Sequence, residues 1–524
     1  MSDSSEKQGI WKVISASSVG TLIEWYDFYI FGSLATIISK QFFPEEQSTA
    51  ALLSTLAIFA AGFIVRPFGA LVFGRLGDLI GRKYTFLLTL VLMGGSTFAI
   101  GLVPGYKTIG MWAPLIVLLL RLIQGLALGG EYGGAATYVA EHAPPGRRGF
   151  FTSWIQTTAT LGLFLSLGVI LLARNSLAPE LSDSIKIFED WGWRIPFWVS
   201  ILLVGLSIYI RMKMHESPEF ARLKKSGKVS KNPLKESFGN RTNLKMVLLA
   251  LFGAVMGQGV VWYTGQFYAQ SFLENTCKLD FEQSRTILLW AILFATPFFV
   301  VFGSLSDKIG RKWIMLGGML LAIITYRPIY QTFLDKTDVK TLSVAEEGAP
   351  KIKLSALPSG DSLKTSSYPL KFTDGSSCVK VTTDTLTTTG QIKPAAKILY
   401  KDKVVNSSTS WLFIALIFVL VLYVTMVYGP IAAFLVELFP TKIRYTSMSL
   451  PYHIGNGIFG GLVPFISTLI VELSKNPSNP GGSPLAGLWY PIGVAAVCFV
   501  IGTIYLTNKI DNNVMDDTNE YVHD

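Results

Sequence analysis

The chain has 524 residues and a formal net charge of +10; half of its residues are hydrophobic, 13% are aromatic and only 15% are charged. Its mean hydropathy is positive, and stretches such as 199–210 and 411–427 contain no charged residue. Surface helices of a soluble protein need a polar face, so this composition excludes a soluble protein and predicts several membrane-spanning helices.

Twelve apolar runs follow one another along the chain, and a run of about 20 apolar residues is enough to span the hydrocarbon core of a bilayer. The segment before the first run is mostly polar, and that run is too long for the core of a signal peptide, so we expect no cleaved leader. The predicted fold class is an all-α polytopic membrane protein with twelve transmembrane helices. We expect them at residues 16–39, 50–74, 84–103, 112–140, 150–173, 194–212, 244–273, 284–304, 312–333, 410–437, 444–473 and 485–508.

An even number of spans places both termini on one side of the membrane, and Lys and Arg are enriched in the short segments on that side. Because basic residues of short loops stay in the cytoplasm, we expect both termini to be cytoplasmic. The net positive charge therefore reflects membrane orientation, and no nucleic-acid partner is implied.

A polar turn between the second and third runs occurs again between the eighth and ninth runs. Residues 74–83 read Gly-Arg-Leu-Gly-Asp-Leu-Ile-Gly-Arg-Lys, and residues 303–312 read Gly-Ser-Leu-Ser-Asp-Lys-Ile-Gly-Arg-Lys. A second pair of similar segments, 141–148 and 437–444, begins with Glu, ends with Arg and contains Pro. The second pair is offset by about 67 residues more than the first, so we expect two similar halves, the second of which carries an insert.

The predicted insert is rich in Ser, Thr, Lys and Gly and contains alternating stretches, which favours a small β-rich cap or a partly ordered loop on the outer side. We predict an N-terminal six-helix bundle at 1–212, a cytoplasmic linker at 213–243, helices seven to nine at 244–334, the extracytoplasmic insert at 335–409, helices ten to twelve at 410–510 and a cytoplasmic tail at 511–524.

Two carboxylates lie near the middle of the first run. Glu24 and Asp27 are three residues apart and therefore share one face of a helix. A charged group at mid-bilayer costs a few kcal/mol or more, so its default interpretation is functional. The alternative is that one of them reaches the interface or forms a fixed structural ion pair.

Two arginines lie inside predicted helices. Arg121 is near mid-depth in the fourth run, and we expect it to form an ion pair with Asp27, because either charge alone would be costly. Arg66 precedes Pro67, which should kink the second helix, and it either lines a pathway or pairs with a neighbouring acid.

Further polar and aromatic side chains in the runs are candidates for a ligand-facing wall. In the seventh run Gln258, Trp262 and Gln266 recur at four-residue spacing, and interhelix packing is the competing interpretation. His453 titrates near physiological pH, although a single histidine is more often a packing residue. The candidate substrate-binding residues are Arg121, Gln124, Glu131, Tyr132, Gln156, Gln258, Trp262, Gln266, Tyr428, His453 and Asn456.

The three cysteines do not have metal-ligand spacing with each other or with any of the four histidines. Cys277 and Cys378 are both expected on the outer, oxidising side, so we predict a disulfide between them, with free thiols as the alternative. Cys498 is expected to pack within the last helix. We expect no metal, no cofactor and no catalytic site.

These motifs resemble those of a known transporter family. The repeated Gly-x-x-x-Asp-x-x-Gly-Arg-Lys turn is similar to the signature of the major facilitator superfamily, and the other motifs resemble its metabolite:H+ symporter family. They are Glu-Trp-Tyr-Asp-Phe at 24–28, Arg-Pro-Phe-Gly at 66–69, the Arg- and Gly-rich segment 121–134, Trp-Gly-Trp-Arg-Ile-Pro at 191–196, Glu-Ser-Pro at 216–218, Tyr-Gly-Pro at 428–430 and Glu-Leu-Phe-Pro at 437–440. The resemblance implies two six-helix bundles around a central cavity in a bacterial cytoplasmic membrane, and substrates such as dicarboxylates, tricarboxylates, shikimate, proline or betaine.

The charges of the repeated turns predict a cytoplasmic gate. Opposite charges at the helix ends would form an ion-pair network that closes the inner side and breaks when it opens, whereas a permanent topological role is the alternative. We expect Asp78 and Arg82 near Glu141 and Arg148, and Asp307 and Arg311 near Glu437 and Arg444.

Proton coupling requires an acid whose protonation depends on conformational state, and we assign Asp27, Glu24 and Arg121 to it. Asp27 would be ionised beside Arg121 and protonated when separated from it. Arg121 could also hold a substrate carboxylate. We therefore expect a monomeric proton symporter that imports a small organic acid. The alternatives are symport of a zwitterionic osmolyte or amino acid, and an uncoupled facilitator or sensor.

Overall fold

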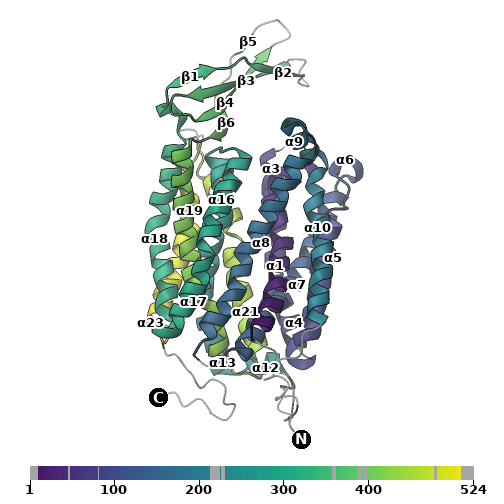
Figure 1. Cartoon of the computed structure of the whole chain (residues 1–524), viewed down its shortest axis with the longest axis vertical. Helices are drawn as coiled ribbons and strands as arrows, with labels where there is room; N and C mark the ends of the chain where they lie inside the picture. Colours follow the sequence, from purple (N-terminus) through teal and green to yellow (C-terminus); the bar gives the residue numbers. More distant parts are fainter. Residues whose placement is uncertain are drawn as a thin grey trace.

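The computed structural model of the chain describes residues 10–44, 48–80, 82–144, 146–212, 225, 230–356, 362–386, 392–393, 398–476, 479 and 481–508. These residues form a long helical bundle with a small β-sheet at one end, above the ends of helices α16, α18 and α19 (Figure 1). We call this the sheet end. The repeated turns join their helices at the other end, which we call the turn end.

The first half of the chain is a bundle in which α1 packs against α8 and α10, and α7 packs against α4 and α5. Each apolar run is helical because lipid offers its backbone polar groups no partner. Helix α3 ends at Ile64 and α4 begins at Arg66, where Pro67 interrupts the helix as predicted. The elements are α1 Ile10–Ser33, α2 Ala35–Phe42, α3 Ser48–Ile64, α4 Arg66–Ile80, α5 Arg82–Ile100, α6 Tyr106–Ile109, α7 Trp112–His142, α8 Arg148–Ser176, α9 Leu181–Asp190, η2 Gly192–Arg194 and α10 Ile195–Met212.

The second half forms a similar bundle, preceded by the short helix α12. Among its helices, α14 packs against η7 and α23, and α19 packs against α16 and α18. The elements are α12 Pro233–Phe238, α13 Arg241–Ala250, η3 Leu251–Val255, α14 Met256–Tyr263, η4 Thr264–Tyr268, α15 Ala269–Ser271, η5 Phe272–Thr276, α16 Phe281–Ala295, α17 Pro297–Ile309, α18 Arg311–Lys336, α19 Ser407–Tyr428, α20 Ile431–Leu438, α21 Arg444–His453, η7 Ile454–Gly460, α22 Val463–Leu473, η8 Ala486–Leu488 and α23 Trp489–Tyr505.

Twelve helical runs are therefore present in the described part of the chain. Ten of them have the length and hydropathy needed to cross a membrane, and α1 with α2 and α5 supply the other two. The two halves meet along α8 and α17, along α4 and α21, and along α7 and α21.

The residues between α18 and α19 form an antiparallel sheet. Its strands are ordered β1-β3-β4-β5, with β2 beside β3 and β6 beside β4. Successive side chains of a strand point to opposite faces of a sheet, so the alternating sequence of this segment suits β-strands. On one face Leu370, Phe372 and Cys378 form a small apolar cluster. The elements are η6 Val339–Thr341, β1 Val344–Glu347, β2 Lys351–Ala356, β3 Ser362–Phe372, β4 Ser377–Leu386, β5 Ile392–Lys393 and β6 Leu399–Val404.

The cysteines near the sheet are free thiols in the structure, contrary to the predicted disulfide. Cys277 follows η5 and is buried against the bundle, whereas Cys378 lies in the apolar cluster of the sheet. Lys403 lies close enough to both thiols to interact with them electrostatically, and its Nζ donates to the Thr337 carbonyl at 2.6 Å. The two thiols thus belong to different packing clusters, Cys277 to the core of the bundle and Cys378 to the sheet.

Both thiols are expected to react slowly with a maleimide while the protein is folded. Burial raises the pKa of the Cys277 thiol to about 12 and also raises the pKa of Cys378, so little reactive thiolate exists at pH 8. Mass spectrometry should show both thiols unlabelled in the folded protein and labelled after unfolding in detergent without reductant. Absence of labelling after unfolding would instead demonstrate a disulfide.

Candidate functional site

Asp27 of α1 is completely buried in the first half. Among the described residues, neither of its carboxylate oxygens has a hydrogen-bond partner. The neighbouring Thr97 hydroxyl donates to the Met93 carbonyl at 3.0 Å and accepts from Gln124 Nε2 at 2.8 Å. A buried carboxyl in such a place is costly as an anion and can be accommodated when it carries a proton.

The predicted ion pair between Asp27 and Arg121 does not occur among the ion pairs of the described residues. Gln124 lies between them: Arg121 donates to its side-chain oxygen, and Gln124 Nε2 approaches the Asp27 backbone carbonyl at 3.3 Å. Because Gln124 is three residues from Arg121, both side chains lie on the same face of α7. The Gln124 amide takes the place beside Arg121 that the Asp27 carboxylate was expected to fill.

Both buried arginines lie against aromatic rings. The Arg121 guanidinium is 4.6 Å from the ring centroid of Phe31 and 5.0 Å from that of Phe59. Arg66 lies 4.2 Å from the ring centroid of Phe63, and it acts electrostatically on Arg121 and on Tyr263 of the other half. Cation–π contacts lower the cost of these charges without neutralising them. The centre of the protein is therefore rich in positive charge.

Aromatic side chains of the two halves meet at the centre. Trp25 and Tyr29 of α1 contact Trp262 of α14, with ring centroids 5.5 and 5.7 Å apart. Tyr132 of α7 stacks on Tyr452 of α21 at 3.5 Å, with planes inclined by only 4°. These rings contact one another across the region where the sequence motifs imply a central cavity.

Hydrogen bonds extend this aromatic contact. Gln156 Nε2 donates to the Tyr132 hydroxyl at 2.6 Å, and the hydroxyls of Tyr428 and Tyr452 are 2.6 Å apart. Three predicted site residues, Tyr132, Gln156 and Tyr428, are thus brought together with Tyr452. The sequence prediction omitted Tyr452 because it has no charge and lies beside Pro451 and His453.

The polar residues of the second half divide into two groups. Gln258 and Asn456 donate to each other at 3.0 and 2.9 Å, as expected for interhelix packing. By contrast, both amide atoms of Gln266, both ring nitrogens of His453 and the indole nitrogen of Trp262 lack partners among the described residues, although all three side chains are buried. Buried polar atoms normally have partners, so these are groups that a ligand or water can satisfy.

Segments of π-helix lie beside these groups. The segment η4 contains Gln266 and begins two residues after Trp262, and η7 contains Asn456 and directly follows His453. A π-helical turn holds one extra residue and is frequent at functional sites, because it redirects side chains from the regular α-helical face. This irregularity was not predicted from the sequence.

The Asp residues of the two repeated turns contact opposite halves in similar ways. Asp78 of α4 accepts from the Thr446 backbone N–H at 3.1 Å and from its hydroxyl at 2.6 Å, in the first turn of α21. Asp307 of α17 accepts from the backbone N–H groups of Gly149 and Phe150, both at 2.8 Å, in the first turn of α8. Each carboxylate satisfies free N–H groups at a helix N-terminus, where negative charge is favourable.

Glycines of the repeat allow this approach. A side chain on Gly303 would collide with Ser153 of α8, and one on Gly149 would collide with the Gly303 carbonyl and with Arg311. Gly310 has a φ of +93°, a conformation that favours glycine, and it separates α17 from α18.

Ion pairs complete the closure at the turn end. Arg311 binds Asp307 at 2.7 Å and binds both oxygens of Glu437, at 2.8 and 3.2 Å. Glu141 of α7 pairs with Arg444 of α21 at 3.4 Å. Arg444 was predicted near Asp307, Arg311 and Glu437 of its own half; the ion pair that it forms in the structure crosses to Glu141 of the first half.

Some predicted residues cannot be placed in full. The side chains of Glu24, Arg82 and Glu131 lie outside the described part of the structure. Arg148 is described and is buried at the start of α8.

Sequence reasoning missed a buried charge at the sheet end. Arg285 of α16 has only 1% of its side chain exposed, pairs with Glu274 at 3.1 Å and donates to the Ser33 carbonyl of the first half at 2.8 Å. In the sequence it lies close to Glu282 and Gln283, so it reads as an ordinary polar helix end.

Comparison with known proteins adds to this geometry. Residues 12–236 match the family described as "Sugar (and other) transporter". The chain is 33% identical to the inner membrane metabolite transport protein YhjE of Escherichia coli (strain K12), over 87% of each chain. It is 28% identical to the citrate-proton symporter of Klebsiella pneumoniae, over 94% of this chain and 90% of the relative.

A further relative is the proline/betaine transporter of Escherichia coli (strain K12), 29% identical over 94% of this chain and 82% of the relative. Among solved structures, the proton:xylose symporter XylE of the major facilitator superfamily, bound to 6-bromo-6-deoxy-D-glucose, matches with a TM-score of 0.65 at 14% identity, over 95% of each chain. That likeness concerns the fold alone.

Proposed function

The chain belongs to the metabolite:H+ symporter family of the major facilitator superfamily, and from this premise we propose that it imports a small organic anion. It is a proton-coupled secondary active transporter rather than an enzyme. The observation that carries the choice of substrate is a set of buried hydrogen-bond donors in the second half that have no partner among the described residues. Trp262 and Gln266 offer N–H groups without partners, and His453 can offer another. A carboxylate supplies the acceptors that such a site lacks.

The proposed cycle uses Asp27 as the proton carrier. In the structure the halves are joined at the turn end, and Asp27 is separated from Arg121 by Gln124. This arrangement suits a protonated Asp27. When the halves rock, direct contact between Asp27 and Arg121 would favour the ionised acid and release the proton. A substrate carboxylate that competes for Arg121 links substrate binding to protonation.

The contacts of Asp78, Asp307, Glu141, Arg311, Glu437 and Arg444 serve as the inner gate in this proposal. Their support is that Asp78, Asp307 and the Glu141–Arg444 pair join the two halves at the turn end. Arg311 binds Asp307 and Glu437 within the second half, and most of these side chains are buried. A buried charge that loses its partner is costly, so partly broken ion pairs are disfavoured. Such contacts therefore suit a gate with two discrete states.

A zwitterionic osmolyte is the second candidate substrate. Trp25, Tyr29, Trp262 and Phe267 lie around one another with centroid separations between 5.2 and 5.8 Å. If the rings part, they can hold a quaternary ammonium group by cation–π contacts.

Uptake into proteoliposomes distinguishes these substrates. With an imposed inward pH gradient, we expect accumulation of radiolabelled citrate or α-ketoglutarate and its loss on addition of a protonophore. A gradient of one pH unit supports about tenfold accumulation per proton. Accumulation of betaine or proline alone would favour the second candidate, and equilibration without accumulation would contradict proton coupling for these solutes.

We also propose that both termini are cytoplasmic, that the sheet is extracytoplasmic, and that a monomer acts without any nucleic-acid partner. The support for the orientation is the distribution of Lys and Arg. An epitope inserted after Asp374, in the exposed β3–β4 turn, should bind antibody on intact spheroplasts.

A further inference from the structure

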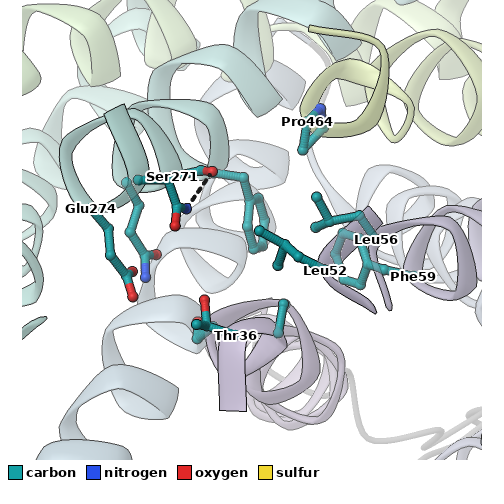
Figure 2. Close-up of a pocket in the computed structure, with 13 residues that line it drawn as sticks. Thr36, Leu52, Leu56, Phe59, Ser271, Glu274 and Pro464 are labelled. Atoms are coloured by element: carbon teal, nitrogen blue, oxygen red, sulfur yellow. Dashed lines mark hydrogen bonds between the residues drawn. The ribbon is translucent and has the colours of Figure 1, made fainter. Parts of the chain in front are cut away.

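A pocket lies between the two halves toward the sheet end. Figure 2 shows its two unlike walls: Leu52, Leu56 and Phe59 of α3 form an apolar side, and Ser271 and Glu274 of the second half lie opposite. Gln270 and Asn275 add further polar groups to the second wall. The pocket adjoins the central residues, because Phe59 and Phe267 line it, with ring centroids 5.8 Å apart, and also belong to the central aromatic contacts. Its polar wall contains none of the central polar residues described above.

Arg285 connects two of the residues that line this pocket. Its Nη1 bonds Glu274 at 3.1 Å, and its Nη2 bonds the Ser33 carbonyl of the first half at 2.8 Å. The Phe281 carbonyl accepts a further bond at 3.2 Å. Among the described residues the Arg285 Nε has no partner, although the side chain is almost completely buried.

The ion pair between Arg285 and Glu274 has a weaker geometry than the ion pair between Arg311 and Glu437. Arg311 binds both oxygens of Glu437, whereas Arg285 binds only one oxygen of Glu274. A bidentate pair is stronger and better oriented than a single bond. Glu274 is also partly exposed, at 16% of its side chain, so solvent and solutes can reach it.

We propose that this pocket is an outer binding site for carboxylates, where an incoming carboxylate displaces Glu274 from Arg285. The displaced Glu274 turns into the polar side of the pocket, beside Gln270 and Asn275. The solute carboxylate can use the Nε donor that Glu274 leaves unfilled. Because Arg285 also binds Ser33, its movement toward the solute weakens one contact between the halves. This site rests on the proposed function and adds a point of capture before the central site.

Cysteine protection tests the site without requiring transport. Ser271→Cys, in a chain whose three native cysteines are replaced by Ser, places a thiol on the pocket wall. We expect a membrane-impermeant maleimide to label it from the outside of cells. Citrate or α-ketoglutarate should slow the labelling, and the neutral solute glycerol should not.

Charge variants in the Ser271→Cys background identify the anion-binding residue. Loss of a hydrogen bond to a charged group corresponds to about a tenfold or greater loss of affinity, so Arg285→Gln should require at least about tenfold more carboxylate for protection. The carboxylate concentration that protects Arg285→Lys should lie between those that protect the parent protein and Arg285→Gln. Glu274→Gln removes the internal competitor, and protection should then occur at several-fold lower concentration. A merely destabilised protein would not bind more tightly.

Arg174→Gln is the matched control. Arg174 pairs with Glu282 at 3.8 Å across the same end of the two halves. Glu282 does not line the pocket, whereas Arg285 binds the lining residues Glu274 and Ser33. Arg174→Gln should leave protection unchanged. Protection that survives Arg285→Gln, protection lost equally in Arg174→Gln, or no protection by either acid would overturn the site. Failure of the proposed function is separate, because it appears as absent accumulation in proteoliposomes whatever the labelling shows.

Discussion

Asp27→Asn is expected to abolish accumulation driven by a pH gradient while exchange of substrate across the membrane continues. The substitution preserves the size of the side chain and mimics the protonated acid, so it removes the proton carrier without opening a cavity. With no proton to release, the variant can only equilibrate its substrate. At a gradient of one pH unit, the accumulation ratio should fall from about ten to about one per coupled proton.

The measurement is paired uptake and counterflow in proteoliposomes. Counterflow needs no net proton movement, so it should persist in Asp27→Asn and show that the protein is folded. Asp183→Asn is the control, because Asp183 is an exposed acid of α9 that pairs with Lys186 at 3.4 Å. Gradient-driven accumulation by Asp27→Asn would show that another group carries the proton.

Several features of the central site could be predicted because they depend on the chain locally. Asp27, Arg121 and Gln124 stand out as polar residues in apolar runs, and the helical period places Arg121 and Gln124 on one face. The repeated turn can be found because its sequence occurs twice, and a recurring Asp near a helix end indicates a similar role in both halves. Burial in a membrane makes these signals strong, since a polar residue there is expensive.

Partners in the other half could not be predicted in the same way. Glu141 binds Arg444 rather than a residue of its own half, and that choice depends on how the halves are rotated against each other. The same holds for Tyr132 on Tyr452 and for Arg285 on Ser33, since the residues of each pair are more than 200 positions apart in the chain. No local pattern encodes the relative position of two rigid bundles, particularly when that position changes during function.

The π-helical segments were also hidden from sequence reasoning. The stretch 251–276 is apolar and rich in glycine and aromatic residues, which suits a regular helix as well as an irregular one. The π-helical segments contact α23, α19 and η7, which are distant in the sequence, and such packing is invisible to a local pattern. Gln266, within such a turn, has no hydrogen-bond partner among the described residues, whereas Gln258, in a regular α-helical segment, is paired with Asn456.

Asp307→Asn is expected to shift the protein toward the state that is open at the turn end. The amide retains the size of the carboxylate but loses the charge that holds Arg311 and two N–H groups of α8. Removing one partner of a buried ion pair costs about 3 kcal/mol or more. A bias of that size changes the ratio of two states by roughly 150-fold, so uptake should fall at least about tenfold as the outward-open state is depleted.

Ser153→Cys reports this opening, in a chain whose native cysteines are replaced by Ser. Ser153 is fully buried beside Gly303, at the seam between α8 and α17. In inside-out vesicles its labelling should accelerate by at least about tenfold when Asp307→Asn is added. Asp78→Asn should act in the same direction, because Asp78 makes the corresponding contact with α21. Asp335→Asn, at an exposed position on α18, should have no effect. Unchanged labelling in both Asp78→Asn and Asp307→Asn would mean that these carboxylates hold the helix ends together in every state, because a contact that never breaks cannot bias a transition.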